Sequence, residues 1–198
     1  MKAINIIIIG ALALFSLSVH AGLSRIIDSD GQLTGAKNVS VGNKLYDVDF
    51  VAGSCITVFG GCNDNASFLF KTAGDAFDAS SALLEQVFID IEGGAQFDSS
   101  PKLTKGCESS TDCTVLTPYS VFEAFSQEFF NFSFARNVQN NIKDLVSASA
   151  QNLAFDTPAT TYAVWRVAEV SEVSEVPTPT AFSLFALSIF GLLTVRRR

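Results

Sequence analysis

The chain has 198 residues, of which 48% are hydrophobic, and its formal net charge is −7. All 20 acidic residues lie between Gly22 and Glu175, against the nine basic residues that remain when Lys2 and the three terminal arginines are set aside, a net charge of −11. Phosphate binding needs clustered Lys and Arg, so this composition excludes nucleic acid as an expected partner, and the length of the stretch predicts one domain.

The N-terminus has the pattern of a secretory signal peptide. Lys2 supplies the positive start, Ile4 to Val19 is largely apolar, and Val19-His20-Ala21 is a small-residue cleavage site. We predict a signal peptide over residues 1–21, recognised by the secretion machinery and cleaved between Ala21 and Gly22. An uncleaved N-terminal anchor is the alternative.

Two β-strands are predicted on either side of Gly42-Asn43. In Lys37–Val51, the side chains of Tyr46, Val48 and Phe50 alternate with those of Asp47 and Asp49. This period of two predicts a β-hairpin with one solvent-exposed face. Phe68 and Phe70, also two residues apart, predict a further strand over Ser67–Lys71.

The four cysteines form two local pairs, Cys55 with Cys62 and Cys107 with Cys113. In an exported protein this pattern indicates disulfides. Four cysteines allow three connectivities, and the turn-forming residues inside each short loop favour local pairing. Zinc is the competing interpretation, although the cysteine spacings are wider than usual and His20, the only histidine, leaves with the signal peptide.

Asp75–Ile91 has a helical period. Phe77, Leu84, Val87, Phe88 and Ile91 would form its apolar stripe. Thr72 and Asp75 have the spacing of a capping box, and Gly93-Gly94 would end the run. The polar segment Glu92–Thr111 that follows is expected to be a long loop held by the second disulfide.

The segment Cys113–Asn137 has a divided pattern: Phe122, Phe125 and Phe129 have helical spacing, whereas Phe130, Phe132 and Phe134 alternate. We predict a strand over Phe129–Arg136. A weaker helix is expected from Ile142, Leu145, Val146 and Leu153, and a closing strand over Thr161–Val170 would place Ala163, Trp165 and Val167 on one face. The predicted fold class is α+β, a mainly antiparallel sheet with one packed helix and a second weaker one, over residues 22–168.

Candidate sites are few. Asp28-Ser29-Asp30-Gly31 resembles the start of a calcium loop, but Val39 stands where the bidentate acid should be, which favours a turn. Asn63-Asp64-Asn65 could offer oxygen ligands or be turn chemistry. No cofactor and no metal are predicted, although the acidic charge leaves a weak Ca²⁺ site open.

We predict no catalytic residue. A mature chain without histidine cannot run a Ser-His-Asp or Cys-His mechanism. The pair Asp47 and Asp49 could in principle hydrolyse a glycoside. The ordinary explanation of this spacing is that both carboxylates lie on the solvent-exposed face of one strand.

The C-terminus combines an acidic linker over residues 169–175 with a short apolar run. Ala181–Val195 is 15 residues long, against the roughly 20 that a helix needs to cross a bilayer. We predict a short transmembrane helix here, kept in place by a cytoplasmic stop-transfer cluster. That cluster is Arg196, Arg197 and Arg198.

A proline-bracketed motif precedes this helix and consists of Val176, Pro177, Thr178 and Pro179. Motif, helix and arginines, residues 176–198, together resemble the sorting signal of PEP-CTERM proteins of Gram-negative bacteria, in which glutamate usually stands where this chain has Thr178. The resemblance implies that an exosortase removes the tail. A plain tail-anchored envelope protein is the alternative.

The segment GQLTGAKNVSVGNKLYDVDFV, followed by a cysteine pair and a helix, is similar to a group of small PEP-CTERM proteins whose biochemical role is not established. These resemblances imply an exported, non-enzymatic protein of the cell surface or extracellular matrix, associated with exopolysaccharide or biofilm. Its precursor would lie on the periplasmic face of the inner membrane. A carboxylate-dependent polysaccharide-active enzyme is the rival expectation.

Overall fold

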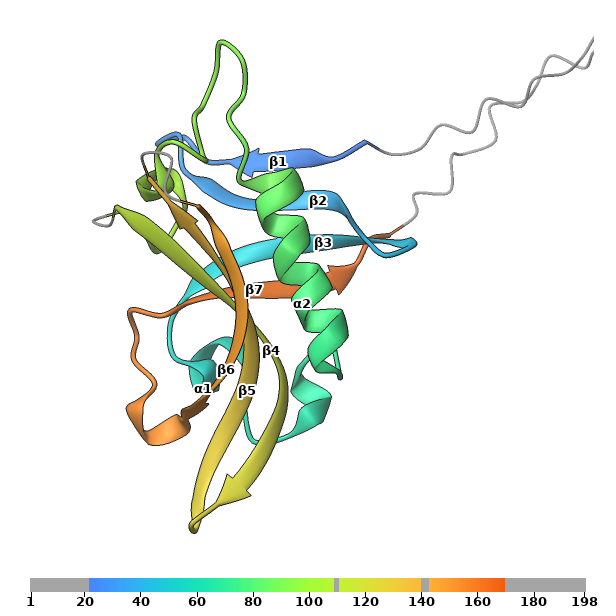
Figure 1. Cartoon of the computed structure of the whole chain (residues 1–198), viewed down its shortest axis with the longest axis vertical. Coiled ribbons are helices and arrows are strands. Elements are labelled where there is room, and N and C mark those ends of the chain that lie inside the picture. The colour runs from blue at the N-terminus through green and yellow to red at the C-terminus, as the bar shows by residue number, and fades with distance from the viewer. Residues whose placement is uncertain (1–21, 109–110, 140–142, 170–198) are drawn as a thin grey trace, which may run out of the picture.

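The computed structural model describes residues 22–108, 111–139 and 143–169, and within them seven strands form one sheet (Figure 1). The order across the sheet is β1-β2-β3-β7-β4-β5-β6. Every neighbouring pair is antiparallel except β4 and β7, which are parallel. The strands are β1 (Ser24–Ile27), β2 (Leu33–Val41), β3 (Lys44–Ala52), β4 (Asp112–Ala124), β5 (Gln127–Val138), β6 (Leu145–Asn152) and β7 (Thr161–Val167). The expectation of a mainly antiparallel sheet is therefore confirmed.

The main helix is α2 (Ala73–Ala82), which continues as a π-helical turn over Leu83–Val87. A five-residue helix, α1 (Cys55–Phe59), follows β3. Short 3-10 turns lie at Asn65–Ser67, Pro101–Leu103 and Leu153–Phe155.

The start of α2 is capped as predicted, but its end is not where the glycines suggested. The Thr72 hydroxyl accepts a hydrogen bond from the Asp75 N–H at 3.1 Å. At the other end Arg25 of β1 donates to the carbonyl oxygens of Gln86 and Val87 at 2.5 and 2.7 Å. These carbonyls have no partner within the helix, so Arg25 satisfies them and the helix ends at Val87 rather than Ile91.

The buried stripe of α2 also differs from the predicted one. Val87 and Phe88 are buried as predicted, but the other buried positions are mostly small residues, Ala76, Ala79, Ser80 and Ala82, together with Leu83. Phe77 is 41% exposed and Ile91 36%. The small stripe brings α2 close to the sheet, where it contacts β2, β4, β5 and β6.

The sheet therefore has two covered faces. On the inner face, α2 packs against a core that includes Val48, Phe50, Val115 and Trp165. The predicted hairpin around Gly42-Asn43 is confirmed, with Val48 and Phe50 buried. On the outer face, α1 and the segment after it cover a smaller cluster: Cys55, Cys62, Phe68, Leu116, Phe130, Phe132 and Tyr162.

The sheet changes direction between β7 and β4. The strands β1, β2, β3 and β7 run across the molecule in Figure 1, whereas β4, β5 and β6 run down it. Only two residue pairs, Val115 with Thr161 and Leu116 with Tyr162, join β4 to β7. Because the two strands diverge beyond these pairs, the sheet twists sharply at this junction.

Two further elements differ from the sequence expectations. Ser67–Lys71 is not a strand, because Phe68 packs in the outer cluster and Phe70 in the inner core. The helix expected from Leu145, Val146 and Leu153 is instead strand β6, in continuous register with β5; Ile142 lies outside the described residues.

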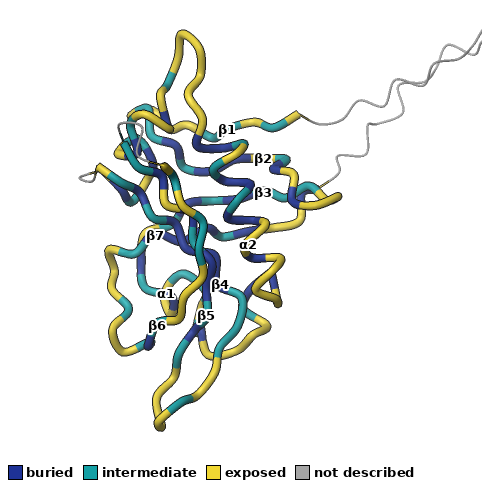
Figure 2. The backbone as a smooth tube through the Cα atoms, in the orientation of Figure 1, coloured by how far each residue is buried: buried dark blue, intermediate teal, exposed yellow. Residues whose placement is uncertain are grey.

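The closing strand is shorter than expected, since β7 ends at Val167, which is exposed. The divided segment before Phe129 is also strand. It forms a long β4–β5 hairpin whose tip is exposed (Figure 2).

Candidate functional site

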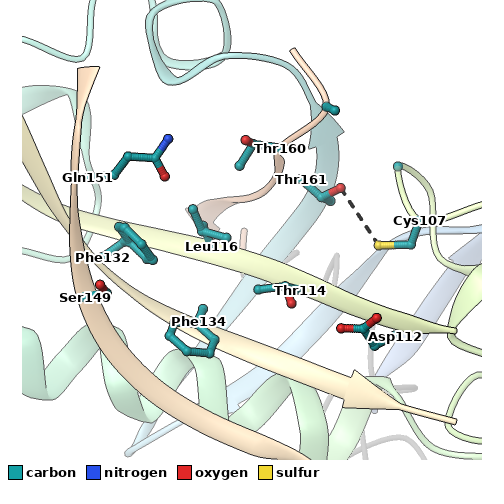
Figure 3. Close-up of a pocket in the computed structure, with 12 residues that line it drawn as sticks. Cys107, Asp112, Thr114, Leu116, Phe132, Phe134, Ser149, Gln151, Thr160 and Thr161 are labelled. Carbon is teal, nitrogen blue, oxygen red and sulfur yellow. Dashed lines mark hydrogen bonds between the residues drawn. The ribbon is translucent and has the colours of Figure 1, made fainter. Parts of the chain in front are cut away.

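An open groove of about 480 Å³ lies on the outer face, where β4 and β7 diverge. Its floor consists of Leu116 on β4 with Phe132 and Phe134 on β5 (Figure 3). The register pairs Leu116 with Phe134 and Phe132 with Ser149 of β6, so these side chains share one face of the sheet. The groove residues therefore lie together because the strand order places β4, β5 and β6 next to one another.

Polar side chains surround this apolar floor. They are Asp112, Thr114, Ser149, Gln151, Thr160 and Thr161. Five of these six carry only neutral hydroxyl or amide groups, which both donate and accept hydrogen bonds. A ligand in the groove would therefore meet aromatic rings from below and uncharged hydrogen-bonding groups at the sides.

The one charged lining residue is already paired. The Asp112 carboxylate accepts a hydrogen bond from Arg136 at 2.8 Å, and both side chains are partly exposed. An exposed pair of this kind contributes little to stability. The Arg136 guanidinium partly neutralises the Asp112 carboxylate, so the lining of the groove carries little net charge.

The second disulfide and a glycine border the groove. Cys107 and Cys113 are bonded, and the Cys107 sulfur lies 4.0 Å from the Thr161 hydroxyl. Gly106 has φ +86°, and a Cβ there would meet the Thr161 side chain. Only glycine allows this close approach of the backbone.

A partly buried hydrogen-bond network holds the outer cluster together. The Tyr162 hydroxyl donates to the Asp156 carboxylate at 2.8 Å, and the Cys55 N–H donates to the same carboxylate. Burial, and then the neighbouring Asp156, raise the pKa of Tyr162. Cys55 is bonded to Cys62, so the network ties α1 and the first disulfide to β7.

The predicted local disulfides are both present, Cys55 with Cys62 and Cys107 with Cys113. The other candidate residues have structural partners. Asp28 accepts hydrogen bonds from the N–H groups of Asp30 and Gln32, as a turn residue does. Asp64 likewise accepts from the Ala66 N–H at the start of a 3-10 turn.

The carboxylates of Asp47 and Asp49 lie on the exposed side of β3 but outside the groove. Asp47 accepts from the N–H of Asn38, which has φ +58° at a bulge in β2. Asp49 pairs with Arg166 at 2.5 Å. Each carboxylate thus has a different partner.

Three further carboxylates gather near the β5–β6 connection. Burial raises the pKa of Asp98, and the nearby carboxylates of Asp144 and Asp90 raise it further. In the part of the chain that the structure describes, no group of three or more His, Cys, Asp or Glu side chains is arranged to hold a metal ion.

The predicted signal peptide and sorting signal lie outside the described residues. This applies to Ala21 of the cleavage site, to Val176–Pro179 and to Arg196–Arg198. Among residues 22–108, 111–139 and 143–169, no helix has the length and apolar character needed to span a membrane.

Sequence reasoning placed the aromatic groove residues on the correct strand but missed those contributed by β6. The strand pattern of Phe130, Phe132 and Phe134 placed the aromatic row correctly on one strand. Ser149 and Gln151 were missed because their segment was expected to be helical. No family model matches the chain, and no match was found among curated proteins or solved structures.

Proposed function

We propose that this chain is an exported, non-enzymatic protein of the cell surface or extracellular matrix that binds exopolysaccharide in the outer-face groove. The observation that carries the proposal is the lining of the groove, in which Phe132 and Phe134 lie among neutral hydroxyl and amide groups. Sugars present apolar C–H faces that pack on rings and hydroxyls that exchange hydrogen bonds. Such a lining suits a polysaccharide better than a phosphorylated ligand.

The open shape supports a polymer as the ligand. The groove has a volume of about 480 Å³ and lies on the surface of the sheet. A chain of sugars can pass along such a surface and leave at both ends, whereas small ligands are mostly enclosed in deeper pockets.

A carboxylate-dependent polysaccharide-active enzyme is the rival function. Glycoside hydrolysis ordinarily uses two carboxyl groups on opposite sides of the scissile bond. Among the described residues that line the groove, Asp112 is the one carboxylate, and Arg136 pairs with it. This favours binding without cleavage.

Delivery to the outside would follow from the two terminal segments. We propose that residues 1–21 direct export and that an exosortase processes the tail at Val176–Pro179, with Ala181–Val195 holding the precursor in the membrane. The two disulfides are compatible with an oxidising compartment. Determining the C-terminal peptide of protein recovered from the envelope and the medium tests this part, because an intact Arg198 throughout would mean a permanent anchor.

The groove is tested with the full chain and the exopolysaccharide of its own host. We expect the polysaccharide to retain the protein, and the Phe134→Ala and Gln151→Ala variants to be retained at least about tenfold more weakly. Phe125→Ala is the matched control, since Phe125 is 96% exposed at the tip of the β4–β5 hairpin, outside the groove. Shortening of the polysaccharide would favour the enzyme, and equal retention of all variants would exclude the groove.

A further inference from the structure

The two edges of the sheet differ in how well they are protected against pairing with another strand. The first edge, β1, has four residues, carries Arg25 and has an irregular register between Ile26 and Ile27. Short length, charge and bulges are the devices by which proteins block unwanted strand pairing. The edge formed by β1 is therefore protected.

The other edge, β6, has none of these devices. Its eight residues, LVSASAQN, include no charged residue and no proline. Its register with β5 is continuous from Leu145 to Asn152. Ala148, Ser149 and Ala150 are exposed one after another, so the middle of this strand is accessible to another molecule. An edge of this kind is open to a further strand.

One hydrogen bond shows which backbone groups of β6 point outward. The Ser133 hydroxyl of β5 donates to the Ser147 carbonyl oxygen at 3.1 Å, so the backbone of Ser147 faces β5. Backbone groups alternate along a strand. Val146, Ala148 and Ala150 therefore direct their N–H and C=O groups away from the sheet.

We propose that β6 pairs antiparallel with β6 of a second copy of this chain, about a two-fold axis at Ala148. Ala148 would then face Ala148 of the second copy, and Val146 would face Ala150. Each of these pairs can exchange two hydrogen bonds, so the outward groups would form about six bonds across the interface. The result is one sheet that continues through both copies.

The strand itself identifies a second copy as the partner. Its outward groups lie at equal intervals on both sides of Ala148, which makes the edge self-complementary under a two-fold axis. The stretch between Gly22 and Glu175 is acidic overall, since it contains all 20 acidic residues of the chain. An edge without charge lets two acidic molecules approach each other there. The side chains of Ala148 and Ala150 are small enough for close contact.

The test measures the mass of the full chain in mild detergent by light scattering after size exclusion. Ala148→Lys places two like charges at the two-fold axis, and Ala148→Pro removes the outward N–H. Ala148→Ser is the matched control that keeps both size and backbone. We expect dimers for the wild type and Ala148→Ser at micromolar concentrations, and monomers or at least about tenfold weaker association for the other two variants.

Trp165 fluorescence and circular dichroism establish that each variant is folded. If Ala148→Pro fails to fold, Ala148→Lys decides alone, since Ala148 is exposed. A monomeric wild type overturns the proposal. Equal association of all variants also overturns it, because the contact would then lie elsewhere, for example in the C-terminal segment shared by all of them.

Discussion

Removing the hydroxyl of Tyr162 should destabilise the fold by about 1.5–2 kcal/mol. The side chain is fully buried, at 0% exposure, and its hydroxyl donates to the Asp156 carboxylate at 2.8 Å. Hydrogen bonds to charged groups contribute about 1.5–3 kcal/mol. We expect the lower end of this range for Tyr162→Phe, because Asp156 is partly exposed and water can replace the lost donor.

Asp156→Ala should cost more than Tyr162→Phe, roughly 2–4 kcal/mol, because it leaves the buried hydroxyl and the Cys55 N–H without their acceptor. Urea denaturation measures both effects. Trp165, the single tryptophan of the chain, is buried in the inner core and reports unfolding. A loss below about 0.5 kcal/mol for Tyr162→Phe would show that the network does not hold α1 to β7.

Three other predictions concern the helix end, a turn and a carboxyl group. Arg25→Ala should lower the unfolding free energy by about 2–3 kcal/mol in the same denaturation assay, because two carbonyls at the end of α2 lose their donor. Arg25→Lys should recover less than half of this loss, because an ammonium lacks the planar fork with which the guanidinium donates to both carbonyls. Phe125 and Ser126 form the β4–β5 turn with φ +52° and +58°, so Phe125→Asn with Ser126→Gly should raise the unfolding free energy by about 1 kcal/mol, and unchanged stability would contradict the strain argument. Burial raises the pKa of Asp98, as does the neighbouring Asp144, so this group favours folding below its unfolded pKa of about 3.9 and loses that contribution as pH rises. Asp98→Asn should therefore be more stable than the wild type at pH 7 and equal to it near pH 3, as thermal unfolding at the two pH values would show.

The features that the sequence predicted correctly depend on neighbouring residues. The hairpin at Gly42-Asn43, the Thr72 cap and the two disulfides each depend on residues only a few positions apart. Turn residues, capping spacing and short cysteine loops are local signals that a single sequence carries. The aromatic row on β5 is visible for the same reason.

The features that the sequence missed depend on distant partners. Arg25 ends α2 from β1, which lies about 60 positions earlier in the chain. The segment that forms β6 contains two alanines, which favour a helix, and it is a strand because β5 pairs with it over its whole length. Because strand β6 was not predicted, the groove residues that it contributes were not predicted either.

Pairing through β6 would join the binding surfaces of the two copies. Ser149 and Gln151 line the groove from β6, so a second β6 at a strand spacing of about 4.8 Å would place the two grooves side by side on one continuous face. A polymer long enough to occupy both grooves would gain effective concentration at the second one. Ala148→Lys should therefore weaken retention by long exopolysaccharide while leaving binding of short fragments unchanged, whereas Phe134→Ala should weaken both and leave the dimer intact. Equal losses for long and short ligands in Ala148→Lys would mean that the edge and the groove act independently.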